Sequence, residues 1–362
     1  MPPKGLNPAR KKRKQQNSPP KQPQNANEKL FVRHIKRMAE TGLPVVVAAT
    51  PQRVALVDRL LSRFEDLPSD LKLCLLEPAS RSKPVEFTSA DPRWSSLQDT
   101  LALGADCGGV VVVSNQFREH MHAQGMFNPI KDLGVPVVSA FGYPPLIDRP
   151  PTPSVHKGIT YQGMFELASK WAAAARFENP TYVEFGTLEG RTMTYAWQYM
   201  KQVPNLDFVA FDSFAGILGT VDDEEYVFPE GSFYANRETF MHNMEVCGVD
   251  IDRLTVTQCD ITTLTTDLEL TKDVDVGTPA VINIDVDVYK PALTALEYLT
   301  PSLAQGSLLL MDDYDSMRAA RNIGERLALT DWLKGNPRFE VEEWRRYGQW
   351  GRAFIIHTED GK

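Results

Sequence analysis

The sequence predicts an α/β protein with two sheets and a basic N-terminal tail. Short apolar runs alternate with helical patterns along most of the chain, which is typical of parallel strands joined by crossover helices. A proline-rich stretch at 143–158 separates two such alternations, and residues 1–28 contain almost no large apolar side chain. We therefore expect a disordered tail at 1–28, a small α/β domain at 29–150 and a larger α/β domain at 155–358.

Composition describes an ordinary globular chain. Of the 362 residues, 42% are hydrophobic and 24% are charged. No apolar run reaches the ~18 residues that span a bilayer, and no signal-peptide core follows the basic residues near the start. The four cysteines are far apart in the sequence, which argues against structural zinc and favours a reducing compartment: Cys74, Cys107, Cys247 and Cys259. We expect a cytoplasmic protein without a membrane span.

The net charge of −8 combines a basic tail with an acidic body. Residues 1–30 hold eight Lys or Arg residues against one acid, Glu28, so the rest of the chain carries −15. An acidic body makes nucleic acid an unlikely main ligand. The basic run at 10–14 fits a localisation signal, an arm for anionic surfaces, or solvated disorder without a specific role.

The domain at 29–150 is predicted to be a parallel sheet whose role the sequence leaves open. Its candidate strands lie at 45–49, 73–76, 110–113 and 135–138, with helical patterns at 53–64 and 95–103. No glycine-rich loop follows the first strand. His120 and His122 form an H-x-H pair without a third ligand in view, and Asn115 and Ser139 follow strands. We expect a module that contacts a partner, a substrate or a second copy of the chain, so that a homo-oligomer could form through it.

The larger domain begins with a helix at 161–175 and then a strand, a glycine turn and a second helix. The strand at 181–185 leads into Gly186, which lets backbone approach a ligand, and Gly190, which lets the next helix pack closely on the strand. The following strand at 208–211 ends in Asp212, 26 residues after Gly186. In βαβ nucleotide-binding units an acid at this position hydrogen-bonds ribose hydroxyls. A ligand that contains a ribose is therefore expected at this turn.

Two later apolar runs each end abruptly in paired carboxylates. The runs at 281–284 and 308–310 flank a helical pattern at 290–306, so they predict two neighbouring parallel strands. Their carboxyl ends meet at one edge of the sheet, where the acids that follow them gather: Asp285, Asp287, Asp312 and Asp313. Clustered carboxylates repel one another unless a cation or a proton lies among them. The alternative is that these acids are solvated loop residues or helix caps.

The remaining elements complete a sheet of seven strands. A long aperiodic stretch at 214–234 is predicted to be a lid or a disordered loop. A strand at 254–256 ends near Asp260, where an acid could meet an adenine edge. A helix at 319–333 and two strands at 339–344 and 353–357 close the chain, with the last strand antiparallel.

Four motifs of this domain resemble class I S-adenosylmethionine-dependent methyltransferases: 184–192 (EFGTLEGRT), 211–216 (FDSFAG), 284–289 (IDVDVY) and 310–314 (LMDDY). More narrowly, they resemble the macrocin O-methyltransferase group, which methylates sugar hydroxyls of macrolides and related natural products. The resemblance covers about 155–358 and implies a Rossmann-like methyltransferase sheet. Two positions depart from the group: Val286 stands where it commonly has glycine, and the sequence after Asp313 differs from its usual continuation.

The resemblance also implies a role for each matching residue. Asp285, Asp312 and Asp313 would ligate magnesium or another divalent cation, and Asp287 is the candidate catalytic base. Glu184, Gly186 and Gly190 would hold the methionine part of S-adenosylmethionine, Asp212 its ribose and Asp260 its adenine. The implied cofactor site further includes Phe185, Thr187, Arg191, Ser213 and Asp285. The implied acceptor is a small molecule or saccharide that presents a sugar hydroxyl, and a catechol-like diol is a further possibility because it too could chelate a metal.

Three other functions remain open on the sequence alone. Asp285-Val286-Asp287 is a D-x-D after a strand, the pattern by which glycosyltransferases hold a metal and a nucleotide sugar. A nicotinamide-dependent oxidoreductase shares the βαβ start, but 186–190 is not G-x-G-x-x-G and the paired aspartates would be unexplained. A methyltransferase-like fold that binds ligands without catalysis is the third.

Overall fold

The computed structural model of the protein describes residues 26–64, 66–76, 94–114, 117–140, 159–265 and 274–359. The predictions about the basic run at 10–14, Asn115 and the prolines at 143–158 lie outside these residues. Helix α1 (Ala26–Ala39) begins the described part of the chain. Its Glu28 is buried and pairs with Arg63 of the next helix.

The N-terminal unit is a five-stranded parallel sheet with the order β3-β2-β1-β4-β5. Its strands are β1 (Val45–Ala49), β2 (Lys72–Leu75), β3 (Trp94–Ser96), β4 (Gly109–Val113) and β5 (Val137–Ser139). Its further helices are α2 (Val54–Arg63), α3 (Leu97–Leu101), α4 (Phe117–Gly125) and α5 (Asn128–Lys131). The four predicted strands are confirmed, and each is an apolar run because helices cover both faces of the sheet.

The helix predicted at 95–103 begins later than expected. Trp94, Ser95 and Ser96 pair with β2 as a short edge strand. The Ser96 side chain then accepts a hydrogen bond from the backbone N–H of Asp99, and the Asp99 side chain accepts one from that of Ser96. This capping box fixes the first helical residue at Leu97.

The C-terminal unit is a seven-stranded sheet with the order β11-β12-β10-β9-β6-β7-β8. Its strands are β6 (Pro180–Phe185), β7 (Asp207–Asp212), β8 (Leu254–Gln258), β9 (Thr278–Ile284), β10 (Leu308–Met311), β11 (Phe339–Tyr347) and β12 (Gly351–Thr358). The five strands from β8 at one edge to β10 are parallel, and β12 pairs antiparallel with both β10 and β11. The predicted seven-stranded α/β sheet with an antiparallel last strand is confirmed.

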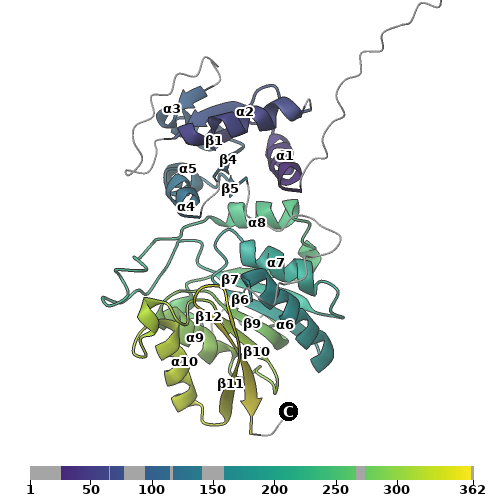
Figure 1. The fold of residues 1–362 in the computed structure, drawn as a ribbon, viewed down its shortest axis with the longest axis vertical. Helices are drawn as coiled ribbons and strands as arrows, with labels where there is room; N and C mark the ends of the chain where they lie inside the picture. Colours follow the sequence, from purple (N-terminus) through teal and green to yellow (C-terminus); the bar gives the residue numbers. More distant parts are fainter. Residues whose placement is uncertain are drawn as a thin grey trace, which may run out of the picture.

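Helices cover both faces of this sheet (Figure 1). Helices α6 (Tyr161–Ala175), α7 (Arg191–Met200) and α8 (Arg237–Val246) pack on one face, and α9 (Tyr289–Leu299) and α10 (Gly324–Gly335) on the other. Strand β6 shows why the runs are apolar throughout: Tyr182 belongs to the first core, whereas Val183 and Phe185 belong to the second.

The prediction that the last helix begins at 319 is wrong. Met317, Arg318 and Ala319 have positive φ values of 50°, 62° and 54°. Three left-handed residues in succession turn the chain away from a right-handed helix, and α10 begins only at Gly324.

The two units meet through α8, an element that the sequence pattern did not predict (Figure 1). The N–H of Val137 in β5 donates to Thr239 Oγ1 at 2.9 Å, and Asn236 Nδ2 donates to the carbonyl of Lys131 at 2.7 Å. The His34 ring of α1 stacks on His242, with ring centroids 5.2 Å apart. These buried polar contacts fix the N-terminal sheet against the C-terminal unit.

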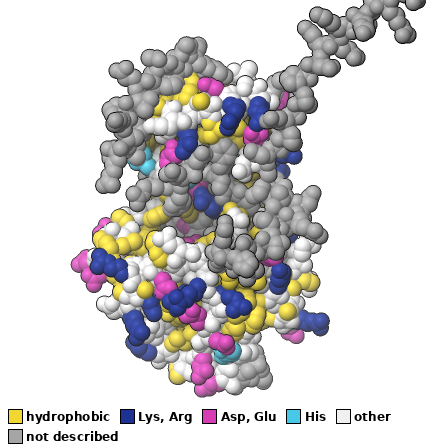
Figure 2. Space-filling model, viewed as in Figure 1, with side chains coloured by type: hydrophobic (Ala, Val, Ile, Leu, Met, Phe, Trp, Pro, Cys, Tyr) yellow, Lys and Arg dark blue, Asp and Glu magenta, His cyan; other side chains and the backbone are white. Residues whose placement is uncertain are grey.

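The surface carries charges of both signs. On the face shown in Figure 2, Lys and Arg side chains of the C-terminal half lie interspersed with Asp and Glu. This mixture is typical of a solvated face rather than of a phosphate-binding stripe. Among the helices described, none has both the length and the apolar character needed to cross a membrane.

Candidate active site

A cavity of about 530 Å³ lies at the carboxyl edge of the seven-stranded sheet. Its walls come from the residues that follow β6, β7, β9 and β10, together with the 214–234 loop and the first turn of α6. The order of the strands reverses between β6 and β9, and ligands of open α/β sheets bind at such a switch point. The volume is that of a site for a small molecule or cofactor.

The turn after β6 is held by Asp212 at the end of β7. Asp212 Oδ2 accepts the N–H groups of Thr187 at 2.6 Å and Leu188 at 3.0 Å, and its Oδ1 accepts that of Phe214 at 2.7 Å. Burial raises the pKa of Asp212, and these hydrogen bonds oppose the rise. Since a carboxylate offers about four acceptor sites, Oδ1 retains capacity for a ribose hydroxyl. Asp212, the residue predicted to bind the ribose, therefore also holds the turn in place.

Both glycines of the turn are required by packing. A Cβ on Gly186 would lie 1.9 Å from the carbonyl oxygen of Asp285, and its φ is +79°. A Cβ on Gly190 would meet Met244 and Phe240 of α8 at 2.3 and 2.9 Å. Gly186 thus lets the turn approach the end of β9, and Gly190 lets it approach α8.

Six of the ten predicted cofactor residues line the cavity: Gly186, Thr187, Arg191, Asp212, Ser213 and Asp285. The other four are Glu184, Phe185, Gly190 and Asp260. Glu184 is buried beneath the turn, where it accepts hydrogen bonds from Thr192 and Tyr182, and burial raises its pKa to about 8. Phe185 stacks on Phe211 in the core, with ring centroids 4.8 Å apart.

Asp260 is exposed and caps a short helical turn. Its Oδ1 accepts the backbone N–H of Thr262 at 2.9 Å. The residues that reach the cavity from this position are its neighbours Ile261 and Thr262. An apolar side chain and a hydroxyl, rather than the carboxylate, are therefore available to a planar ring there.

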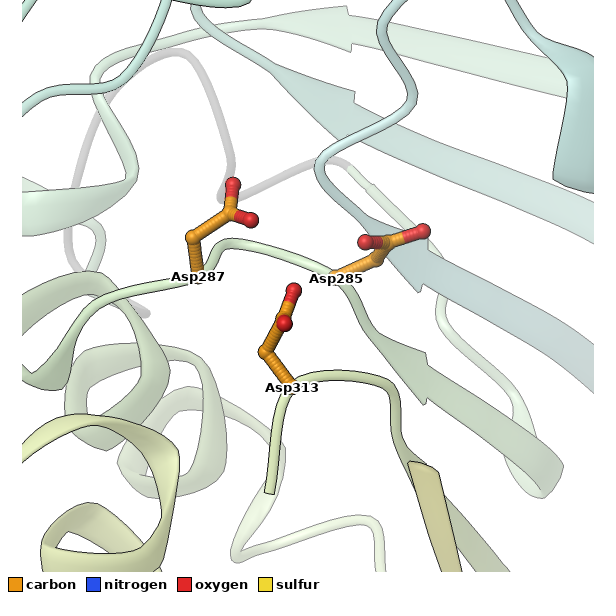
Figure 3. A group of neighbouring side chains, drawn as sticks. All are labelled: Asp285, Asp287 and Asp313. Atoms are coloured by element: carbon orange, nitrogen blue, oxygen red, sulfur yellow. The ribbon is translucent and has the colours of Figure 1, made fainter. Parts of the chain in front are cut away.

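The four strand-end aspartates all line the cavity, and three of them converge (Figure 3). Asp285, Asp287 and Asp313 each offer one oxygen, and these oxygens lie within 4.8 Å of one another. The set predicted to bind metal was Asp285, Asp312 and Asp313, so Asp287, the predicted base, takes the place of Asp312 in this group. We call Asp285, Asp287 and Asp313 the acidic triad.

Burial is the first cause of the raised pKa values in this cluster, and repulsion between carboxylates is the second for Asp285, Asp287 and Asp312. Burial and then repulsion from Asp313 raise the pKa of Asp285 to about 7, and burial raises the pKa of Asp313 to about 6. The pKa values of Asp287 and Asp312 are well above the ordinary range for the same two reasons. Three convergent hard oxygen donors with unbalanced negative charge fit a divalent cation such as magnesium.

We expect the acidic triad to give the metal-free protein an unusual dependence of stability on pH. Because the folded pKa values of Asp285 and Asp313 exceed the ordinary 3.8, their contribution to stability is complete below about pH 4 and is lost as the pH rises through about 6 and 7. Thermal unfolding from pH 4 to 8 should therefore show wild-type Tm falling relative to that of Asp285→Asn.

The difference in Tm between wild type and Asp285→Asn at each pH excludes the effect of other groups that titrate equally in both proteins. Burial lowers the pKa values of His34 and His242, so this pair destabilises the fold as the pH falls, equally in both proteins. Excess MgCl₂ should flatten the wild-type curve near pH 7, because a cation binds the ionised carboxylates. Equal pH slopes in the two proteins would contradict the assignment.

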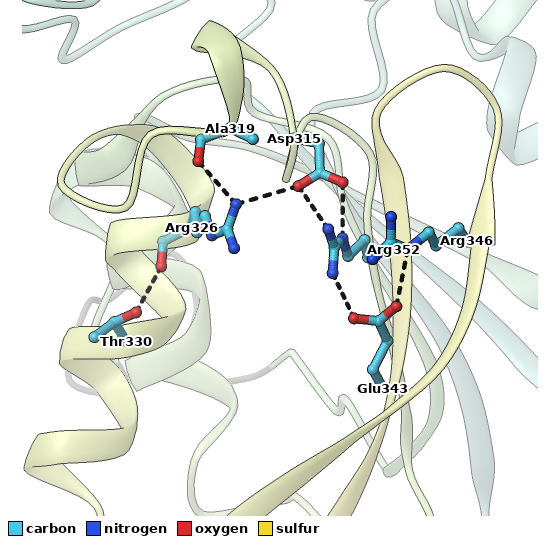
Figure 4. Close-up of polar contacts among 7 residues, drawn as sticks. All are labelled: Asp315, Ala319, Arg326, Thr330, Glu343, Arg346 and Arg352. Carbon is cyan, nitrogen blue, oxygen red and sulfur yellow. Dashed lines mark hydrogen bonds and ion pairs between the residues drawn. The ribbon is translucent and has the colours of Figure 1, made fainter.

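An ion-pair network positions one rim of the cavity (Figure 4). Asp315 accepts hydrogen bonds from Arg352 at 2.8 and 3.0 Å and from Arg326 at 3.4 Å. Its backbone N–H donates to the carbonyl of Trp350 at 3.0 Å. The turn between β11 and β12 is thereby fixed, with Trp350 at the mouth of the cavity and 41% exposed.

The 214–234 loop covers the cavity and is anchored by one buried acid, Glu224. Glu224 Oε1 accepts the N–H groups of Tyr289 at 2.9 Å and Gly324 at 3.0 Å, which are the first residues of α9 and α10. A carboxylate at two helix N-termini is favoured by both helix dipoles. The predicted lid is thus an ordered cover that contributes Ile217, Phe228 and Phe233 to the cavity wall.

Several residues that line the cavity were not predicted, among them Tyr161, Glu189 and Trp350. Tyr161, at the start of α6, donates a hydrogen bond from its hydroxyl to Asp285 Oδ2 at 3.1 Å. Glu189 lies inside the predicted turn, and Trp350 lies in the turn between the last two strands. A tryptophan between two strand patterns was the one available signal, because the contacts of Tyr161 and Glu189 depend on distant segments.

No protein-family model matches this chain, and no curated protein does. The solved structures to which this chain is similar include O-methyltransferases. The O-methyltransferase NovP is 15% identical, with 54% of this chain and 79% of that chain covered and a TM-score of 0.44. The calicheamicin methyltransferase CalS11 is 21% identical, with 54% and 77% covered and a TM-score of 0.42.

A third similar structure is an O-methyltransferase from Bacillus cereus in complex with SAH. It is 13% identical, with 53% of this chain and 79% of that chain covered and a TM-score of 0.36. The chain is thus similar to O-methyltransferases over about half of its length, and at these values the similarity carries no argument about its activity.

Proposed function

We propose that the protein is an S-adenosylmethionine-dependent O-methyltransferase assisted by a divalent cation. The observation that carries the proposal is one cavity that joins the Asp212-held turn of 186–190 to the acidic triad. The order of the strands places the turn and the acidic triad side by side: β7 and β6 end at the turn, and the neighbouring strands β9 and β10 end at the triad. Residues 155–358 would form the catalytic domain, and 29–150 a separate domain.

The charge of the cavity favours a cationic ligand. Among the described residues that line it, six are acids and one, Arg191, is a cation. S-adenosylmethionine carries a positive sulfonium, which suits such a site, whereas the diphosphate of a nucleotide sugar would depend wholly on bound metal. The D-x-D glycosyltransferase is therefore less favoured.

The residues present divide the chemistry between them. S-adenosylmethionine, when bound, supplies an electrophilic methyl group, and a divalent cation at the triad supplies Lewis acidity toward the acceptor hydroxyl. Asp285 and Asp313 would hold the cation, with Asp312 available beside them. Asp287 would accept the proton that the hydroxyl loses as the new O–CH₃ bond forms. Tyr161 would keep the Asp285 carboxylate oriented.

The acceptor that fits this cavity presents a hydroxyl to the triad and a ring to the rim. Trp350, Phe233 and Tyr161 line the same cavity as the acids, and aromatic faces pack well on the apolar face of a ring. A sugar hydroxyl on a saccharide or natural product meets both requirements, as does a catechol-like diol.

The proposal is tested by calorimetric titration of S-adenosylhomocysteine into the purified protein, with and without magnesium. We expect micromolar binding that Asp212→Ala abolishes, because the variant loses both the ribose contact and the hydrogen bonds that hold the turn. Asp207→Ala is the matched control, since Asp207 is an exposed acid at the opposite end of the same strand.

Each alternative predicts a different result. Absence of binding by the wild-type protein under all conditions would overturn the proposal, and tight binding of a nucleotide sugar would favour a glycosyltransferase. Binding without methyl transfer to any hydroxylated acceptor would favour a non-catalytic binding protein.

A further inference from the structure

The cofactor turn carries an acid that faces the N-terminal unit. Glu189 lines the cavity through the turn, yet its side chain is only 4% exposed. Its Oε1 accepts a hydrogen bond from Nε2 of His120, 2.7 Å away, and the His120 side chain is 3% exposed. His120 lies on α4, so this contact joins the five-stranded unit to the turn of the seven-stranded unit.

The contact continues into the cavity. The same Glu189 oxygen lies 3.7 Å from Nη2 of Arg191, the cation of the cavity wall. A chain of polar groups thus runs from His120 through Glu189 to Arg191. A side chain in the N-terminal unit therefore bears directly on the geometry of a residue that faces the cavity.

The N-terminal unit also fixes His120 from its own side. Glu119, the preceding residue, accepts hydrogen bonds from Thr50 Oγ1 and Arg53 Nη2, both at 3.0 Å. Thr50 directly follows β1, so α4 is tied to the carboxyl end of that strand. His120 is consequently presented by a rigid element rather than by a loop.

Hydrogen bonds also hold the backbone of the turn at 186–190. Asn243 Nδ2 of α8 donates to the Glu189 carbonyl at 2.7 Å, and α8 is itself bonded to β5 through Thr239. On the opposite side Asp212 binds the N–H groups of Thr187 and Leu188. The turn is thus held between its own sheet on one side and α8 with the N-terminal unit on the other.

We propose that the N-terminal unit completes the cofactor site, with His120 as a positioning residue that fixes Glu189 and, through it, Arg191. This inference rests on the proposed function, because it assumes that the turn binds S-adenosylmethionine. It gives the described part of the N-terminal unit a role within the chain: this unit holds the cofactor turn in its binding geometry.

The test compares S-adenosylhomocysteine binding by full-length variants, measured by calorimetry below the unfolding range of each. His120→Ala should weaken binding about tenfold, because a hydrogen bond to a charged group is lost. His120→Gln places an N–H near the position of Nε2 and should bind within about threefold of wild type. His122→Ala is the matched control, since this exposed histidine lies on the same helix and should bind as wild type.

A second readout separates positioning from general stability. The magnesium-induced shift in Tm should be the same in His120→Ala and wild type, because the triad lies beyond β6, at the ends of β9 and β10. His120→Ala binding with wild-type affinity would overturn the inference. Equal loss of affinity in His120→Gln and His120→Ala, matched by equal loss of Tm, would also overturn it.

Three further outcomes can be told apart. If His120→Ala does not fold, His120→Gln is compared with His120→Asn, whose amide is too short to reach Glu189. His120→Gln must then bind S-adenosylhomocysteine and His120→Asn must bind it weakly. Equal affinities of these two variants would overturn the inference. If the wild-type protein binds no S-adenosylhomocysteine, the proposed function fails and this inference fails with it. Binding that is insensitive to every His120 variant overturns the inference alone.

Discussion

Gly186→Ala is expected to remove more than about 4 kcal/mol from the free energy of unfolding, or to prevent folding. Its φ of +79° strains any residue with a Cβ, and that Cβ would lie 1.9 Å from the carbonyl oxygen of Asp285. The neighbour is backbone at the end of β9, where the Asp285 N–H also bonds to the Phe185 carbonyl at 2.9 Å, so it cannot move aside as a side chain would. Urea unfolding followed by circular dichroism measures the loss.

Gly248→Ala is the control that separates the steric clash at Gly186 from the backbone strain of a positive φ. Gly248 follows α8 with a φ of +73°, and a Cβ added there would find nothing within 4 Å. It should lose only the roughly 1–2 kcal/mol that a left-handed conformation costs an L-residue. Similar losses in the two variants would show that the close approach of Gly186 to Asp285 is not a main determinant of stability. Any folded Gly186→Ala protein should also bind magnesium more weakly, since the triad begins at Asp285.

The sequence predicted the sheet well because its strands are buried on both faces. Runs such as 308–311 are apolar throughout, and this signal does not depend on any distant contact. The spacing of Gly186 and Asp212 likewise follows from one βαβ unit, and in the structure Asp212 accepts hydrogen bonds from Thr187 and Leu188, the two residues after Gly186. Local sequence patterns were therefore enough to predict the strands and the turn.

Long-range geometry decided what the sequence could not show. Asp312 and Asp313 were predicted to ligate one cation together, but only Asp313 belongs to the acidic triad, because consecutive residues after a strand point in different directions. Asp287 joins the group with a φ of +66°, a conformation that no sequence pattern reveals. The contact between His120 and Glu189 depends on how two sheets dock, and the H-x-H spacing at 120–122 gave no indication of it.

Asp287→Asn is expected to lower the rate of methyl transfer by about 10²–10⁴-fold while raising the Tm of the metal-free protein. Asparagine tolerates a positive φ at least as well as aspartate, so the backbone at 287 should be kept. What is lost is the carboxylate that would accept the acceptor's proton. The rate is measured by transfer of labelled methyl from S-adenosylmethionine to an acceptor found by screening.

The rise in Tm follows from the same carboxylate. Burial, with repulsion from Asp313 and Asp285, places the pKa of Asp287 well above its ordinary range, so at pH 7.5 folding must either bury a charge there or take up a proton. Asparagine avoids both costs, and a gain of about 3 °C or more is expected at magnesium-free pH 7.5. Asp58→Asn, which alters an exposed acid on α2, should change neither rate nor Tm.

The two readouts together identify the role of Asp287. If Asp287 is a base in a crowded acidic site, Asp287→Asn should transfer methyl more slowly, be more stable without metal and bind S-adenosylhomocysteine as wild type does. Such a site maintains activity at a cost to stability. Loss of cofactor affinity along with rate would instead indicate that Asp287 shapes the cavity. A wild-type rate in Asp287→Asn would place the base elsewhere, with Asp312 the remaining strand-end aspartate outside the triad.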